Sequence, residues 1–249
     1  MLPRLGARLL GVGLAAALAA VTIALTLSGQ LGLYINPESA WFAVTMAVIA
    51  LVGTIASFAL PLGAEDDHGH DHGDDHDHDH AHGGGSAWAT AATVTGGLLA
   101  TGTALAIVLT PPATLSAELA MSRDTGAAPL FQGADTIALA ATGDTAAFGV
   151  GEWASVFATA TNPEAFDGDE VTLTGFVTPG DDGFALTRLI ITHCVIDAQP
   201  ASVPITVSGA PGTGTWVTVT GTIRDVDGRL QVEAASVDVV DQPKDPYEY

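Results

Sequence analysis

Apolar residues follow two different patterns along the chain. Before position 111 they form three long, nearly uncharged runs, over residues 9–27, 41–62 and 88–110. A helix needs about 20 apolar residues to cross a bilayer, so these runs predict a membrane α-helical half with about three spans. From residue 170 onward, apolar residues instead alternate with polar ones, a period typical of half-buried β-strands.

The alternating segments predict a small all-β domain. In EVTLTGFVT, Val171 and Leu173 share one face of the strand, and Thr172 and Thr174 share the other. FALTRLIIT, VPITV, TWVTVTGTI and RLQVEAASVDVV follow, separated by turns rich in glycine and aspartate. Five short strands of this kind predict an antiparallel, OB-like barrel.

Domain boundaries follow from the same patterns. The transmembrane region is expected over residues 1–111. Trp153 and Phe157 lie four residues apart, which predicts a short helix over 149–160 with both rings on one face. We expect the β-barrel-like domain to occupy residues 149–249 and a linker to occupy residues 112–148.

Charge limits the partners and orients the chain. The net charge is −21 with only seven Lys and Arg residues, so no basic patch is available and no nucleic-acid partner is expected. Arg4 and Arg8 flank the first run, and no Lys or Arg follows until Arg123. The positive-inside rule then predicts a multi-pass protein of the cell membrane. Its N-terminus and the loop over residues 63–87 would be cytoplasmic, and its C-terminal domain extracytoplasmic. Cleavage of the first run as a signal peptide would leave those two sides unchanged.

The loop over residues 63–87 is dominated by histidine and aspartate. Imidazole and carboxylate groups bind Zn²⁺ and other divalent transition metals. With no apolar residues to form a core, the loop is expected to be disordered and to hold a metal loosely. The alternative is a solvated linker whose metal affinity is incidental. The candidate ligands are His68, His70, His72, His76, His78, His80, His82, Asp71, Asp77 and Asp79.

A second candidate site lies in TRLIITHCVIDAQP, where Arg188, His193, Cys194 and Asp197 are close in sequence. These side chains could contact a metal or a partner. In the structural alternative, Cys194 is a small buried residue and Asp197 caps a turn and bonds Arg188. Catalysis is disfavoured, because adjacent residues of an extended segment point to opposite faces and His193 is poorly placed to activate Cys194. Cys194 is the sole cysteine, so no intrachain disulfide can form.

The runs FDGDEVTLTGFVT, FALTRLIITHCVIDAQP and TWVTVTGTI, with the ending DPYEY, resemble the YcgQ-like permease-subunit family of bacterial membrane proteins. The resemblance implies N-terminal spans, an extracytoplasmic domain and a multi-span permease as partner. The family's segment carries a Cys-Cys pair, and here His193 stands in place of the first cysteine. Four positions match that segment: Arg188, Cys194, Asp197 and Ala198.

These features together predict an accessory subunit of a membrane permease, in contact with the lipid bilayer and linked to divalent-metal transport or homeostasis. The alternative is a membrane-anchored extracytoplasmic binding module without a transport role. The chain is not expected to be an enzyme, because its outer domain has one histidine and no paired acid–base constellation.

Overall fold

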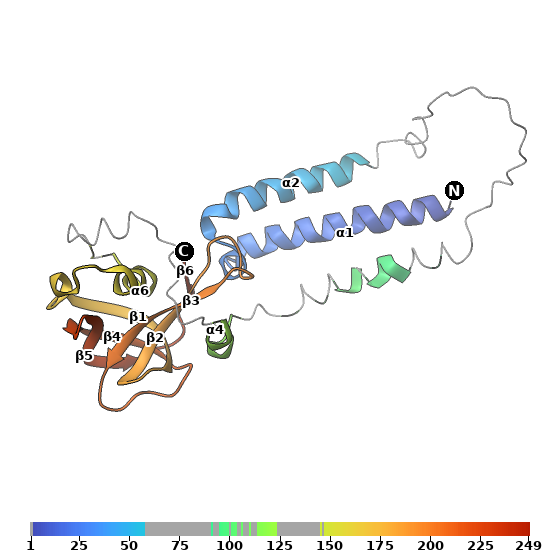
Figure 1. Ribbon diagram of the computed structural model, residues 1–249. Coiled ribbons are helices and arrows are strands. Elements are labelled where there is room, and N and C mark those ends of the chain that lie inside the picture. Colours follow the sequence, from blue (N-terminus) through green and yellow to red (C-terminus); the bar gives the residue numbers. More distant parts are fainter. Residues whose placement is uncertain are drawn as a thin grey trace, which may run out of the picture. The chain divides into compact units, whose positions relative to one another are not determined.

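The computed structural model describes residues 2–57, 91, 95–99, 101–103, 106, 110, 114–123, 145 and 147–249. They belong to two compact units (Figure 1). The helical unit comprises Met1–Leu31 and Pro37–Pro112, and the barrel unit comprises Gly32–Asn36 and Ala113–Tyr249. Five residues of the connection between the first two helices, Gly32–Asn36, thus belong to the barrel unit.

Two long helices form the described part of the helical unit. Helix α1 spans Leu2–Leu27, and helix α2 spans Ala40–Ser57 after a 3₁₀ turn over Pro37–Ser39. They pack side by side (Figure 1). Their threonines remain compatible with an apolar helix because each hydroxyl donates to a carbonyl of the preceding turn, as Thr45 does to Trp41 O at 2.8 Å.

The three predicted spans are not supported as a set. Among the described residues one helix, Pro37–Ser57, is long and apolar enough to cross a membrane. The described apolar part of α1 is shorter, over Gly11–Leu27, which is at the lower limit of a spanning length. Most of the third predicted span, over residues 88–110, lies outside the described residues.

The C-terminal region forms a closed five-stranded β-barrel. β1 pairs with both β2 and β4, and the ring is completed by β2–β3, β3–β5 and β4–β5 pairing. All of these pairs are antiparallel except β3–β5. The barrel prediction is therefore confirmed. The strands are β1 Glu170–Pro179, β2 Gly183–Ile190, β3 Gln199–Thr206, β4 Trp216–Val226 and β5 Arg229–Val239.

Burial follows the predicted alternation. Val171 and Leu173 face the core, while Thr172 and Thr174 lie on the outer face opposite threonines of β4. The β4–β5 register shifts at Thr220/Gly221, where a Cβ on Gly221 would lie 2.5 Å from a β5 carbonyl oxygen. Glycine is therefore required at this bulge.

Helix α6, Val150–Thr159, packs against the barrel strands β3 and β2. Trp153 is buried in the barrel core and meets Phe157 edge-to-face at 6.0 Å, which confirms the predicted aromatic face. A 3₁₀ turn over Pro163–Phe166 then leads into β1. The helix and the barrel therefore share one core.

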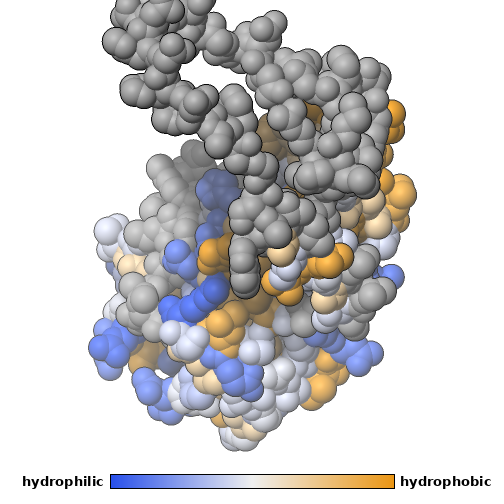
Figure 2. Space-filling view, turned by 90° about the vertical axis from the view of Figure 1, so that its right-hand side faces the viewer, coloured by the Kyte–Doolittle hydropathy of each residue, from blue (hydrophilic) through white to orange (hydrophobic). Residues whose placement is uncertain are grey.

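Two short elements were not predicted from the sequence. Helix α4, Ala117–Arg123, falls within the segment assigned to a linker, and β6, Tyr247–Glu248, pairs in parallel with β2. Ala120 and Tyr247 belong to a second, smaller apolar cluster on the outside of the barrel. The face seen in Figure 2 is mostly blue and pale in its lower half, with smaller orange areas among the polar residues.

Candidate functional site

The predicted metal-binding loop lies outside the described residues. Its seven histidines and the three candidate aspartates, Asp71, Asp77 and Asp79, all lie outside the described residues. Within the described part of the chain, no three His, Cys, Asp or Glu side chains are grouped to hold a metal ion. The loop therefore stays a prediction from sequence.

The second predicted site is a tight turn over residues 192–197, directly after β2. Asp197 organises it: its carboxylate accepts the backbone N–H groups of Thr192, His193 and Cys194 at 2.9–3.2 Å. The expectation that Asp197 caps a turn is thus confirmed. Three N–H donors on one carboxylate fix the backbone, because each would otherwise need another partner.

His193 and Cys194 do not form a joint reactive pair in this turn. The His193 ring extends from the surface with 80% of its side chain exposed, and its Nδ1 lies 3.2 Å from Asp197 Oδ2. Cys194 is a free, half-buried thiol, so the expectation of a small buried residue is met only in part. Its backbone instead forms an antiparallel bridge with Ile35. The turn tip is completed by Ile196, which is 82% exposed.

The segment between α1 and α2 pairs with this turn like a short extra strand. Asn36 N donates to His193 O at 3.0 Å, and Val195 N donates to Tyr34 O at 2.9 Å. The Asn36 side-chain amide also donates to Thr192 O at 3.0 Å. These contacts join positions about 155 residues apart in sequence. They connect the segment between α1 and α2, called the inter-helix segment below, to the barrel.

Helix α4 holds the other side of the same turn. The Arg123 guanidinium donates from Nη1 to Ala198 O at 2.8 Å and to Val195 O at 3.3 Å. A charged donor to backbone carbonyls is among the stronger hydrogen bonds in proteins. The turn is therefore fixed by its own aspartate, by α4 and by the inter-helix segment.

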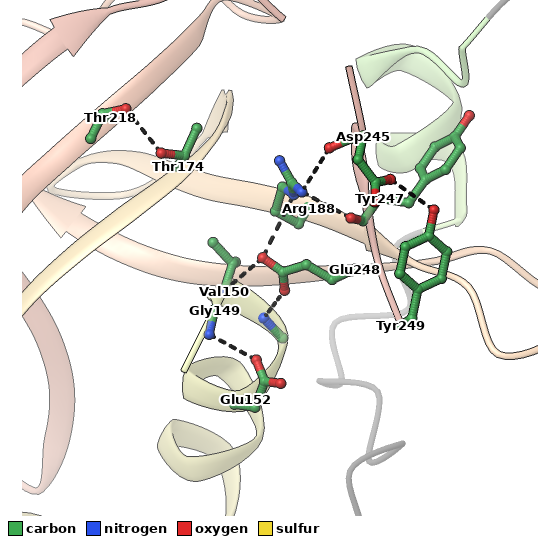
Figure 3. A network of polar contacts seen from close by, with 11 residues as sticks. Gly149, Val150, Glu152, Thr174, Arg188, Thr218, Asp245, Tyr247, Glu248 and Tyr249 are labelled. Atoms are coloured by element: carbon green, nitrogen blue, oxygen red, sulfur yellow. Dashed lines mark hydrogen bonds and ion pairs between the residues drawn. The ribbon is translucent and has the colours of Figure 1, made fainter. Parts of the chain in front are cut away.

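Arg188 has a different role from the one predicted. It is buried in β2 and does not bond Asp197; its Nη2 donates to the carbonyls of Asp245 and Tyr247, at 3.2 and 2.9 Å. Its Nε lies 3.6 Å from Glu248 Oε1 and has no hydrogen-bond partner among the described residues. Arg188 therefore anchors the C-terminal tail (Figure 3).

Glu248 connects this arginine to helix α6. Its carboxylate accepts the N–H of Val150 at 3.1 Å and that of Gly151 at 2.6 Å, while Glu152 reaches back to Gly149 N at 2.9 Å. The first N–H groups of a helix lack internal partners and carry partial positive charge, so a carboxylate stabilises them. Figure 3 shows Glu248 lying between Arg188 and the start of α6.

Burial sets the charge properties of this pair. It lowers the pKa of Arg188, and the charges of Glu248 and Asp245 oppose part of that shift. It raises the pKa of Glu248 against the opposing effects of the Gly151 N–H and Arg188. Both shifts reflect the cost of removing charge from water. The pair therefore fixes the tail rather than presenting a free charge to a ligand.

Two tyrosines extend the tail contacts to other segments. The buried Tyr247 hydroxyl accepts Leu115 N at 2.9 Å, and burial raises its pKa. The Tyr249 hydroxyl donates to Asp245 Oδ1 at 2.7 Å and to Gly32 O at 3.2 Å; its pKa is raised by burial and by the carboxylate. The last five residues thus join β2, α6, the start of α4 and the inter-helix segment.

Comparison with known proteins places the chain by its domains. Two family models match it: the DUF1980 N-terminal domain over residues 12–125 and the DUF1980 C-terminal domain over residues 152–249. No curated protein and no solved structure matches the chain. The matched descriptions do not carry the permease-subunit role that the resemblance to the YcgQ-like family implied.

Proposed function

Because the chain belongs to the DUF1980 family, whose N-terminal and C-terminal domains follow one another along it, we propose one function for the two domains together. The protein is an accessory, non-catalytic subunit of a membrane permease that moves, or responds to, a divalent metal of the zinc type. The barrel is its extracytoplasmic part and is OB-like. The ring order β1-β2-β3-β5-β4, with β3 and β5 parallel, supports that assignment.

The membrane part of the proposal is supported by the surface of α2. Most of its large apolar side chains are exposed, and only Ala47 and Thr54 are buried. A helix that is apolar all round needs an apolar environment. Trp41, near its start, is in the position expected for an interfacial aromatic residue. The exposed residues are Trp41, Phe42, Met46, Val48, Ile49, Val52 and Ile55.

One observation carries the topology: the connection between α1 and α2 is hydrogen-bonded into the barrel unit. A segment so fixed lies on the barrel's side of any membrane. If α2 crosses the bilayer, the chain must return before Ala113 to reach the barrel, and the run over 88–110 is the stretch long and apolar enough to do so. The histidine-rich loop over 63–87 then lies on the opposite side, in agreement with the orientation from Arg4 and Arg8.

The metal part of the proposal rests on that loop. Seven histidines interspersed with aspartates provide several overlapping sets of neutral imidazole and carboxylate ligands. On the cytoplasmic side they would collect or release ions beside a permease. If metal binding is incidental, the alternative function is a membrane-anchored binding module. The closed barrel with its buried core is compatible with that function as well.

A cross-link tests whether the segment between α1 and α2 is paired with the barrel. Ile35 and Cys194 are direct partners in an antiparallel bridge, where Cα atoms lie within the range a disulfide can span. In an Ile35→Cys variant, mild oxidation should produce a disulfide with Cys194, detected by mass spectrometry as a link between residues 159 positions apart that reductant cleaves. Ser208→Cys, in the barrel unit beyond the end of β3 that lies far from the turn over residues 192–197, is the control and should not cross-link. Equal yields in both variants would contradict the pairing.

Site-specific labelling tests the topology. In a Cys194→Ser background, Ile196→Cys presents a thiol at the exposed turn tip and Gly84→Cys presents one in the loop. A membrane-impermeant maleimide should label the first in intact cells and the second only after permeabilisation. Labelling of both without permeabilisation would refute the proposed arrangement.

The transport role needs a separate experiment. Affinity purification of the full chain should recover a multi-span membrane protein, and deletion of the chain should change cellular zinc content. Replacing the seven loop histidines by serine should abolish calorimetric Zn²⁺ binding and reproduce the change in zinc content. If zinc content follows the deletion but not the histidine replacement, the subunit acts without the loop. If neither changes it, the binding-module alternative is favoured.

A further inference from the structure

A cleft on the barrel unit, away from the turn over residues 192–197, has the composition of a ligand site. It has a volume of about 490 Å³ and lies between the start of α4 and the entrance to β4, within the size range of small-molecule sites. We call it the Trp216 cleft. The lining side chains on which the argument depends are Phe176, Trp216, Glu118, Gln242, Thr213 and Thr215.

The aromatic wall of the cleft is held from two directions. The Trp216 ring centroid lies 5.2 Å from the Arg188 guanidinium carbon and 5.5 Å from the Phe176 centroid, with the two rings edge-to-face. Arg188 is itself fixed by the tail carbonyls. An aromatic ring that is already immobilised loses little conformational entropy when a ligand packs against it.

The backbone around the wall is also fixed. Gly214 N donates to Val177 O at 2.8 Å, Val177 N donates to Thr215 O at 2.9 Å, and Val240 N donates to Trp216 O at 2.9 Å. The loop that carries Thr213 and Thr215 is therefore bound to β1, and Trp216, at the start of β4, is bound to the residue that follows β5. The cleft is largely preformed, which lowers the cost of binding.

The polar groups decide the chemistry of the ligand. Two hydroxyls and the Gln242 amide can both donate and accept hydrogen bonds, and Glu118 adds a carboxylate acceptor. The Glu118 pKa is lowered by hydrogen bonds from its backbone N–H and from Ser116. Among the described residues that line the cleft, none is Lys or Arg, so nothing there neutralises a phosphate or another anion.

We infer that the Trp216 cleft binds a saccharide that is neutral or carries an amino group. A sugar ring offers an apolar C–H face for an aromatic wall and hydroxyls for surrounding donors and acceptors, which is the combination this cleft provides. An aromatic wall with a polar rim suits such a ligand better than a peptide side chain, which would need a deeper apolar socket. The inference does not require a permease partner.

The test uses the full chain, purified in a detergent without a sugar headgroup and titrated by calorimetry with a soluble chito-oligosaccharide in its N-acetylated and free-amine forms. We expect saturable binding of at least one form at concentrations up to about 10 mM. Gln242→Ala and Thr213→Ala, both at exposed positions, should each weaken it about five- to tenfold, the effect of one lost hydrogen bond. Gln231→Ala, an equivalent truncation in a different cleft, is the matched control and should leave the affinity unchanged.

Comparison of the two forms assigns the charge of the ligand. Preference for the free-amine form, lost in Glu118→Gln, identifies an amino sugar; equal binding or a preference for the N-acetylated form identifies a neutral one. The inference is overturned if neither form binds, if Gln231→Ala weakens binding as much as Gln242→Ala, or if inorganic phosphate competes. Because the chain is purified alone, a negative result leaves the permease proposal untouched.

Discussion

Helix α2 and the barrel contain the same kinds of apolar residue but place them differently. In α2, Ile49 and Val52 are more than half exposed. In the barrel, Val203 and Val219 are completely buried, and threonines such as Thr172 occupy the outer face. Because transfer of apolar surface out of water is favourable, a barrel with this pattern is suited to water. The α2 pattern is suited to an apolar solvent, in agreement with the proposed membrane location.

The two regions also treat polar groups differently. In the barrel unit, the buried side chains of Arg188 and Glu248 form hydrogen bonds with residues that are far away in sequence. In the described residues of α1 and α2, threonine and serine hydroxyls instead make local contacts, each donating to a carbonyl three or four residues earlier. Local contacts satisfy the hydrogen-bonding groups of a helix without water, as a helix in lipid requires. Long-range contacts instead specify a single tertiary arrangement.

The largest expected effect comes from the buried arginine. Arg188→Met leaves the Glu248 carboxylate and two tail carbonyls without their cationic partner, and loss of one member of a buried pair costs about 3–5 kcal/mol. The midpoint of urea unfolding, followed by tryptophan fluorescence, should fall accordingly. Arg224→Met is the control: its pair with Glu233 is exposed, and such pairs contribute less than about 1 kcal/mol. Similar midpoints for both variants would show that the tail contacts add little.

A charge in α2 tests the comparison directly. Ile49→Lys places an ammonium near the middle of the helix, where a charged residue costs about 2.5–3.5 kcal/mol for insertion into a membrane. The fraction of chain that resists carbonate extraction should fall sharply. Val239→Lys makes the same change at an exposed barrel position and should have no effect. If Ile49→Lys also leaves the carbonate-resistant fraction unchanged, α2 is in contact with water and the proposed location is wrong.

The barrel could be predicted from sequence because its determinants are local. A period of two assigns each residue of β1 to a face, and glycine-rich turns separate the strands. The site was harder, because only Asp197 acts within its own turn. Arg188 meets partners 57–60 positions away, and Asn36 meets residues about 155 positions away. No pattern in the sequence indicates such pairs.

The short elements were missed for a related reason. Helix α4 has seven residues, too few to show a helical period, and β6 has two. Each exists because it packs against the finished barrel: Ala120 and Tyr247 lie in one apolar cluster. The ending DPYEY carries no periodic pattern and contributes to the predictions only through a family resemblance. The clusters of two tyrosines and two acids could have suggested a buried tail, but not its partners.

An isosteric exchange tests the inner and outer faces of the β1–β4 strand pair. Val219→Thr puts a hydroxyl into the core, where it has no partner, and should destabilise the barrel by about 1–3 kcal/mol. The reverse exchange on the outer face of β1, Thr174→Val, removes a 2.9 Å hydrogen bond to Thr218 of β4, whose part-buried hydroxyl remains at the outer face of the barrel, where water can replace the bond. Its cost should be below about 1 kcal/mol. Unfolding midpoints of the two variants give the difference, and equal values would mean that the faces are not distinct.

Helix α6 provides the intermediate case, since it is a helix but belongs to the barrel. A Cβ on Gly149 would lie 2.6 Å from Glu248 Oε1, so Gly149→Ala should push the carboxylate off the helix N-terminus and cost about 1–2 kcal/mol. Gly212→Ala, where a Cβ meets only a threonine hydroxyl at 3.7 Å, is the matched control and should be neutral. Amide hydrogen exchange should then show faster exchange at Val150 and Gly151 in the first variant alone. Unchanged protection there would mean that α6 is stabilised by its apolar face and not by the tail. In that respect α6 would resemble α2 more than it resembles the barrel strands.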